Sequence, residues 1–96
     1  MEQKDKPWVV NREEAVNRTC NAIYEEYKVV ITEFNNKIIS KCNEFKHEIV
    51  YKTDNPVTAK DLHYFYICLG YNVQVEEIPK YKDGIEYTIY KLKLMW

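Results

Sequence analysis

Glycine is scarce in this chain: two of the 96 residues are glycine, and three are proline. Phosphate-binding loops need several glycines close together, because the backbone must approach the phosphate groups. Gly70 and Gly84 stand far apart, so the sequence excludes such a loop. With 46% hydrophobic and 15% aromatic residues, the composition also excludes a disordered linker and indicates one small folded domain.

Metal-binding and catalytic motifs are also missing. Cys20, Cys42 and Cys68 lie too far apart in the sequence for a zinc or dithiol motif. His47 and His63 have no cysteine or carboxylate at a helix-face spacing that completes a metal triad. No nucleophile, base and orienting group form a convincing set. We therefore expect no enzyme, no metal, no cofactor and reduced, structural cysteines of the kind found in the cytoplasm.

Neither the charge nor the hydropathy of the chain points to nucleic acid or to a membrane. The 14 basic and 15 acidic residues give a net charge of −1, without the basic excess typical of nucleic-acid-binding domains. No apolar run approaches the roughly 18 residues of a membrane span. Residues 1–10 have no apolar core of a secretory signal. We expect a soluble protein and disfavour nucleic acid as its partner.

What the sequence does contain is a long apolar stripe over residues 11–49. Its members recur every three or four residues, which is the period of an amphipathic helix. Asn11 can cap the first turn, with Glu14 three residues on. The sequence therefore predicts one helix of roughly 57 Å. The stripe consists of Val16, Cys20, Ile23, Tyr27, Val30, Phe34, Ile38, Cys42, Phe45 and Ile49.

Such a helix is too long for a 96-residue domain to cover, because the radius of gyration of a domain this size is about 13 Å. Part of the stripe therefore needs a partner, and the simplest partner is a second copy of the chain in a coiled-coil-like seam. We expect a homo-oligomer in which the contact is made by Val16, Cys20, Ile23, Tyr27, Val30, Phe34 and Ile38.

The rest of the chain predicts an α+β fold in a single domain. Residues 1–10 form an arm, residues 58–69 a short helix that ends at Gly70, and residues 71–96 an antiparallel hairpin with Asp83–Gly84 in its loop. Residues 47–53 are either the last helical turns or a short strand. In the hairpin we expect Pro79 to end the first strand. The apolar positions of the second strand change face near Tyr90, which indicates either a bulge or a strand whose far half is buried on the other side.

Aromatic residues supply the remaining candidates for partner contacts, since Trp and Tyr lead interface hot spots. They are Trp8, Tyr64, Tyr66, Tyr81, Tyr90 and Trp96. Four lysines interleave with the hairpin tyrosines and could join them in stacking a base: Lys80, Lys82, Lys91 and Lys93. The other reading is that these tyrosines fill strand faces. We expect Leu92, Leu94 and Trp96 to pack, with Trp96 as an exposed anchor the alternative.

The carboxy-terminal third resembles a pattern of many small bacteriophage proteins, in which a helix ends in Leu-Gly-Tyr and two antiparallel strands follow. Here these residues are Leu69, Gly70, Tyr71, the strand to Ile78 and the closing strand of residues 85–96. The resemblance implies a viral origin, where short proteins are virion parts or inhibitors of host machinery. It implies no site.

From these features we expect a non-enzymatic, self-associating protein-interaction protein. The first hypothesis is a phage-type accessory protein or inhibitor that binds a host protein in the cytoplasm of the host cell. The alternative is a small structural protein of a virion. A third hypothesis, a binder of nucleotides or single-stranded nucleic acid, depends on the tyrosines and lysines of the hairpin.

Overall fold

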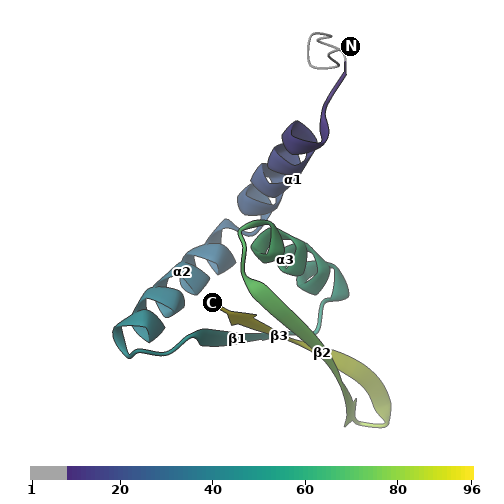
Figure 1. The fold of residues 1–96 in the computed structure, drawn as a ribbon. Helices are drawn as coiled ribbons and strands as arrows, with labels where there is room; N and C mark the ends of the chain where they lie inside the picture. The colour runs from purple at the N-terminus through teal and green to yellow at the C-terminus, as the bar shows by residue number, and fades with distance from the viewer. Residues whose placement is uncertain (1–8) are drawn as a thin grey trace.

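A computed structural model describes residues 9–96 and confirms the α+β class (Figure 1). Helices α2 and α3 lie on one face of a three-stranded antiparallel sheet with strand order β1-β3-β2, and α1 packs on α3. In chain order the elements are α1 (Arg12–Glu26), α2 (Lys28–Asn43), β1 (Glu48–Thr53), α3 (Pro56–Cys68), β2 (Asn72–Lys82) and β3 (Ile85–Met95).

The single helix predicted over residues 11–49 is wrong, because the chain bends at Tyr27 (Figure 1). Tyr27 has φ −113° and ψ 28°, outside the helical region, although its N–H still donates to the carbonyl oxygen of Ile23. Its hydroxyl donates to Asp61 Oδ2 over 2.8 Å. The bend lets α1 pack on α3 while α2 packs on β1. The same apolar period continues through both helices, so the spacing could not reveal the bend.

The predicted helix also ends early, at Asn43, and residues 48–53 form β1. Phe45 adopts a left-handed conformation with φ 61°, which turns the chain back toward the sheet. Ile49, the last member of the stripe, is buried as a strand residue. The strand alternative for this segment is therefore confirmed. Its residues could form either helical turns or a strand, and pairing with β3 favours the strand.

Helix α3 begins at Pro56, two residues before the predicted start. Asn55 caps it, since its side-chain oxygen accepts from the backbone N–H groups of Val57 and Thr58. Proline suits the first helical position, because its missing N–H has no helical partner there. At the other end Gly70 has φ +95°, as predicted for a left-handed terminator.

The first strand of the hairpin extends further than predicted. Pro79 does not end β2, which continues to Lys82. Proline is tolerated because β2 is an edge strand. The connection is a two-residue turn, with φ 53° at Asp83 and φ 78° at Gly84. Positive φ at both central residues is the pattern of a type I′ turn, whose twist matches that of the strands.

The pairing of β2 with β3 runs without a break from Asn72↔Met95 to Lys82↔Ile85. A bulge near Tyr90 is therefore excluded, and the other explanation of the change of face holds. Leu92 and Leu94 are fully buried on the helix side of the sheet. The apolar residues nearer the turn, Ile85, Tyr87 and Ile89, lie on the opposite face and do not reach the core. This half of the hairpin also projects beyond the helices (Figure 1).

The core lies between the helices and the sheet. Its largest fully buried side chains are Phe34, Leu62, Tyr66, Leu92 and Leu94. The ring of Phe34 stacks on Tyr66 with a centroid distance of 5.3 Å. No helix in residues 9–96 combines the length and hydrophobicity that a membrane crossing requires.

Candidate interaction surface

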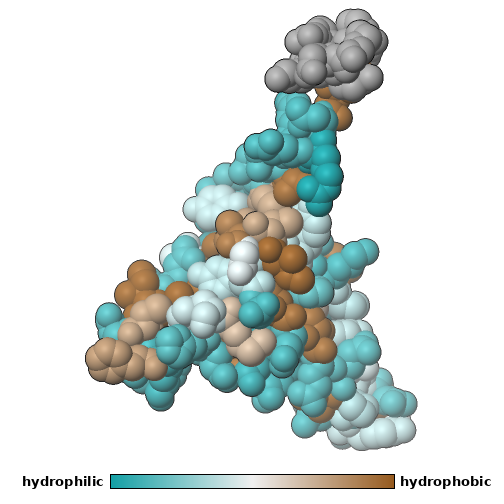
Figure 2. All heavy atoms as spheres, in the orientation of Figure 1, coloured by the Kyte–Doolittle hydropathy of each residue, from teal (hydrophilic) through white to brown (hydrophobic). Residues whose placement is uncertain are grey.

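A recess lined by both apolar and polar side chains lies between α1 and α3, and we call it the α1–α3 groove. It has a volume of about 490 Å³ and is lined by Val16, Asn17, Cys20, Asn21, Tyr24, Phe65, Cys68 and Leu69. Leu69 is 57% exposed and Tyr24 is 39% exposed. Figure 2 shows hydrophobic residues at the surface where these two helices meet. The groove therefore offers apolar area to a partner.

The groove exists because α1 extends past the end of α3. Near the bend, Tyr27 is tied to Asp61, and farther along α1 the residues Val16 and Cys20 face the last turn of α3. Beyond that turn α1 projects from the body (Figure 1). Within residues 9–96 no element covers the outer side of this junction, and the apolar residues there remain in contact with solvent.

The residues predicted for self-association divide into three groups. Ile23 and Phe34 are buried in the core of their own chain, so the predicted intermolecular contact is wrong for these two residues. Val16 and Cys20 line the α1–α3 groove. The other three members pack half-buried against the core: Tyr27, Val30 and Ile38. Of these seven residues, only Val16 and Cys20 on α1 thus line a recess that is open to a partner.

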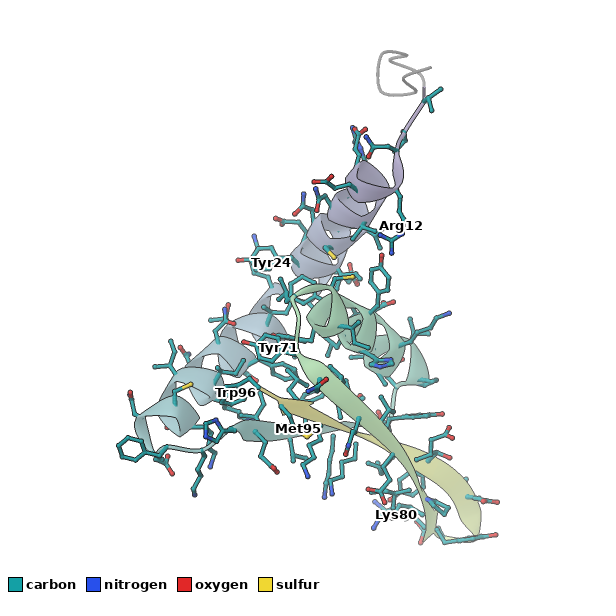
Figure 3. The ribbon with its side chains drawn as sticks, viewed as in Figure 1. Arg12, Tyr24, Tyr71, Lys80, Met95 and Trp96 are labelled. Carbon is teal, nitrogen blue, oxygen red and sulfur yellow. The ribbon has the colours of Figure 1, made fainter. Side chains whose placement is uncertain are left out.

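The predicted aromatic contacts separate in the same way. Tyr66 is buried in the core, which makes it wrong as a partner contact. Tyr90 is half-buried against the core, while Tyr64 and Tyr81 are exposed. The ring of Trp96 lies edge-on to Tyr71 at a centroid distance of 6.1 Å, as Figure 3 shows. Trp8 lies outside the described residues.

The hairpin lysines share a face of the sheet with one hairpin tyrosine, Tyr87, which lies opposite Lys80 on the neighbouring strand. Side chains alternate between the two faces of a strand, so Tyr81 and Tyr90 lie on the helix side of the sheet and their neighbouring lysines on the other side. Figure 3 shows Lys80 on the projecting part of the hairpin. Among the described residues the recorded cation–π contact is Lys28 over Tyr24, at 5.7 Å.

The alternation of side chains along the strands gathers lysines on the face of the sheet that no helix covers. The sequence did not predict this shared face. This face carries Lys52, Lys80, Lys82, Lys91 and Lys93. Two carboxylates share it: Glu76 pairs with Lys91 at 3.8 Å and Glu48 with Lys93 at 3.6 Å. The registers of β1 and β2 on β3 bring these lysines together, and the sequence alone does not reveal those registers.

A second basic recess lies between α2 and β1. Its volume is about 780 Å³, and its lining includes Lys37, Lys41, Lys46 and His47 with one carboxylate, Glu48. Lys41 lies in the last turn of α2, where the helix dipole favours a cation. No group of three or more metal-ligating side chains occurs within residues 9–96.

Burial and contacts raise the pKa of several groups at the α1–α3 contact, among them Tyr27 and Cys20. Burial, together with the hydrogen bond to Asp61, raises the pKa of Tyr27. Burial and contact with the Cys68 thiol raise the pKa of the Cys20 thiol. Both groups are therefore held in their neutral forms at neutral pH, which suits a packed contact better than acid–base catalysis.

Comparison with known proteins adds no family to this description. No family model, curated protein sequence or solved structure matches the chain.

Proposed function

We propose that this chain is a non-enzymatic protein-interaction protein that associates with a second copy of itself through the α1–α3 groove. The observation that supports the proposal is the groove itself, where exposed Tyr24 and Leu69 lie beside half-buried Val16 and Cys20 at the point from which α1 projects. Burying these residues against a copy gains roughly 25 cal/mol for each Å² of apolar area removed from water. The acidic and basic residues are too evenly balanced for charge to be the main attraction.

Light scattering coupled to size-exclusion chromatography tests this proposal. We expect the wild-type mass to exceed that of a monomer at tens of micromolar. Leu69→Lys, which places a charge in the groove, should shift the protein toward the monomer without loss of helical circular dichroism. Val29→Lys is the matched control, because Val29 is an exposed apolar helix residue outside the groove. A wild-type monomer at this concentration contradicts the proposal.

For the biological setting, we propose a phage-type accessory protein or inhibitor of a host protein, acting in the host cytoplasm, with a structural protein of the virion as the alternative. The support is the resemblance of residues 69–96 to small phage proteins. Mass spectrometry of purified particles separates the two roles, since a virion protein is present there in many copies and an inhibitor is absent.

The lysines of the helix-free sheet face favour polyanion binding as a second candidate function. Five lysines with two carboxylates leave this face positive, and phosphate contacts weaken as salt rises. Fluorescence anisotropy with a labelled single-stranded oligonucleotide at low salt tests it. Lys52→Glu should weaken binding, whereas Lys60→Glu on α3 is the control of equal charge change. Absence of binding at low salt rules out this function.

A further inference from the structure

Two cysteines that are remote in sequence meet at the α1–α3 contact. Cys20 on α1 and Cys68 on α3 line the same groove. Their meeting follows from the hydrogen bond between Tyr27 and Asp61: Cys20 lies seven residues before Tyr27, and Cys68 lies seven residues after Asp61. Seven residues are about two helical turns. The step goes backward along α1 and forward along α3, so the two helices run antiparallel. Two turns along each helix from the Tyr27–Asp61 contact therefore bring the two thiols together.

We propose that Cys20 and Cys68 form a reversible redox pair, which a small-molecule disulfide such as oxidised glutathione converts into an intrachain disulfide joining α1 to α3. The direct interaction of the two thiols, which contributes to the raised pKa of Cys20, supports their proximity. Cys68 is exposed and is therefore the thiol that meets oxidised glutathione first, whereas Cys20 is half-buried. Cys42 is exposed on α2, away from this groove.

The reaction proceeds by two thiol–disulfide exchanges. The Cys68 thiolate attacks oxidised glutathione, whose S–S bond breaks as a mixed disulfide forms and one glutathione thiolate leaves. Cys20 then loses its proton and attacks Cys68 Sγ, which releases the second glutathione. Two protein thiols are oxidised, one glutathione disulfide is reduced to two glutathione thiols, and the two protons end on those thiols.

The disulfide would close a loop that contains α2, β1 and most of α3. Closing a long loop restricts the unfolded chain, so the oxidised protein should unfold at a temperature roughly 10 °C or more above that of the reduced protein. α1 would then be attached covalently to the body at the groove. This inference does not depend on self-association, and a monomer would show it equally well.

The test treats the reduced, folded full chain with oxidised glutathione, traps remaining thiols with iodoacetamide, and locates the modifications by peptide mass spectrometry. Oxidation should remove two hydrogen atoms from the protein. We expect a peptide pair linked through Cys20 and Cys68, with alkylation at Cys42 alone. Dithiothreitol should restore three alkylated cysteines and the lower melting temperature. A stable glutathione adduct on Cys68 without the link overturns the proposal, as does a disulfide that includes Cys42.

Two variants and one condition serve as controls. Cys42→Ser should form the disulfide at the wild-type rate, since Cys42 lines no part of the groove. Cys20→Ser should stop at the glutathione adduct on Cys68, because the second thiol is missing. In concentrated urea the disulfides should spread over all three cysteine pairings. Preferential Cys20–Cys68 linkage in urea would show that the fold does not direct the pairing, and would also overturn the proposal.

Discussion

At the scale of single residues, Tyr66 is an exception to the rule that buried polar groups are hydrogen-bonded. Its side chain is 1% exposed, and its hydroxyl has no hydrogen-bond partner among the described residues. The ring packs well, with Phe34 stacked on it and Phe65 and Tyr71 edge-on. The cost of this residue therefore lies in the hydroxyl and not in the ring.

Tyr66→Phe should leave the fold intact and raise the free energy of unfolding by about 1 kcal/mol, because it removes a desolvated hydroxyl and keeps the ring contacts. Chemical denaturation monitored by circular dichroism measures the change. Tyr81→Phe on the exposed hairpin serves as the control and should have no effect. A loss of stability in Tyr66→Phe would show that the hydroxyl has a favourable partner.

The same hydroxyl predicts a loss of stability in alkali. Burial, with a smaller contribution from Tyr71, raises the pKa of Tyr66 well above its usual range. In the unfolded chain the group ionises near pH 10, so above that pH the unfolded state binds fewer protons than the folded state. The contribution of the neutral Tyr66 side chain to the free energy of unfolding is therefore complete below pH 10. It is lost as pH rises toward the folded-state pKa. Denaturation at pH 9 and pH 11 should show a smaller decrease in Tyr66→Phe than in wild type.

At the scale of elements, the end of β3 combines two residues with different roles. Leu94 is fully buried, whereas Trp96 is 37% exposed and contacts Tyr71 through its ring edge. The backbone N–H of Trp96 also donates to the carbonyl oxygen of His47 over 3.0 Å. Packing of Leu92 and Leu94 is thus confirmed, while Trp96 is both packed and accessible.

Leu94→Ala should therefore lower the free energy of unfolding by about 2–5 kcal/mol through loss of burial and the cavity left behind. Trp96→Ala should cost less, roughly 1 kcal/mol, because part of its ring already contacts water and its backbone hydrogen bond remains. Thermal unfolding of the two variants side by side gives the order. An equal loss in both would mean that the Trp96 ring belongs to the core.

At the scale of the whole molecule, the chain is extended for its length. The Cα radius of gyration is 16.9 Å and the principal extents are 58 × 39 × 22 Å, against about 13 Å for a compact domain of this size. Figure 1 shows why, since α1, the end of α2 and the hairpin project in three directions from a small shared core. A shape of this kind exposes much of each element to solvent or to partners.

Phe34 distinguishes the core from an intermolecular seam. Because its side chain is 1% exposed and stacks on Tyr66 within one chain, Phe34→Asp should unfold the protein and not merely dissociate it. Circular dichroism should show loss of helix, and light scattering should show no folded monomer. A folded, monomeric Phe34→Asp variant would place Phe34 in an interface after all.

The sequence by itself determined the local features whose physics is local. Asn11 accepts the Glu14 N–H at 2.8 Å, Gly70 ends α3 with positive φ, and Asp83–Gly84 forms the hairpin turn. Caps, terminators and tight turns depend on a few neighbouring residues and their allowed φ and ψ. The apolar periods likewise predicted the α+β class.

The tertiary structure decided everything that depends on contacts between remote residues. The bend at Tyr27 accompanies a hydrogen bond to Asp61, and segment 48–53 becomes a strand when it pairs with β3. The strand registers place Tyr81 and Tyr90 on the face opposite the hairpin lysines, and the contact of α1 with α3 brings Cys20 next to Cys68. A one-dimensional pattern shows which residues can be buried, but the partner that buries them is set by where other elements pack.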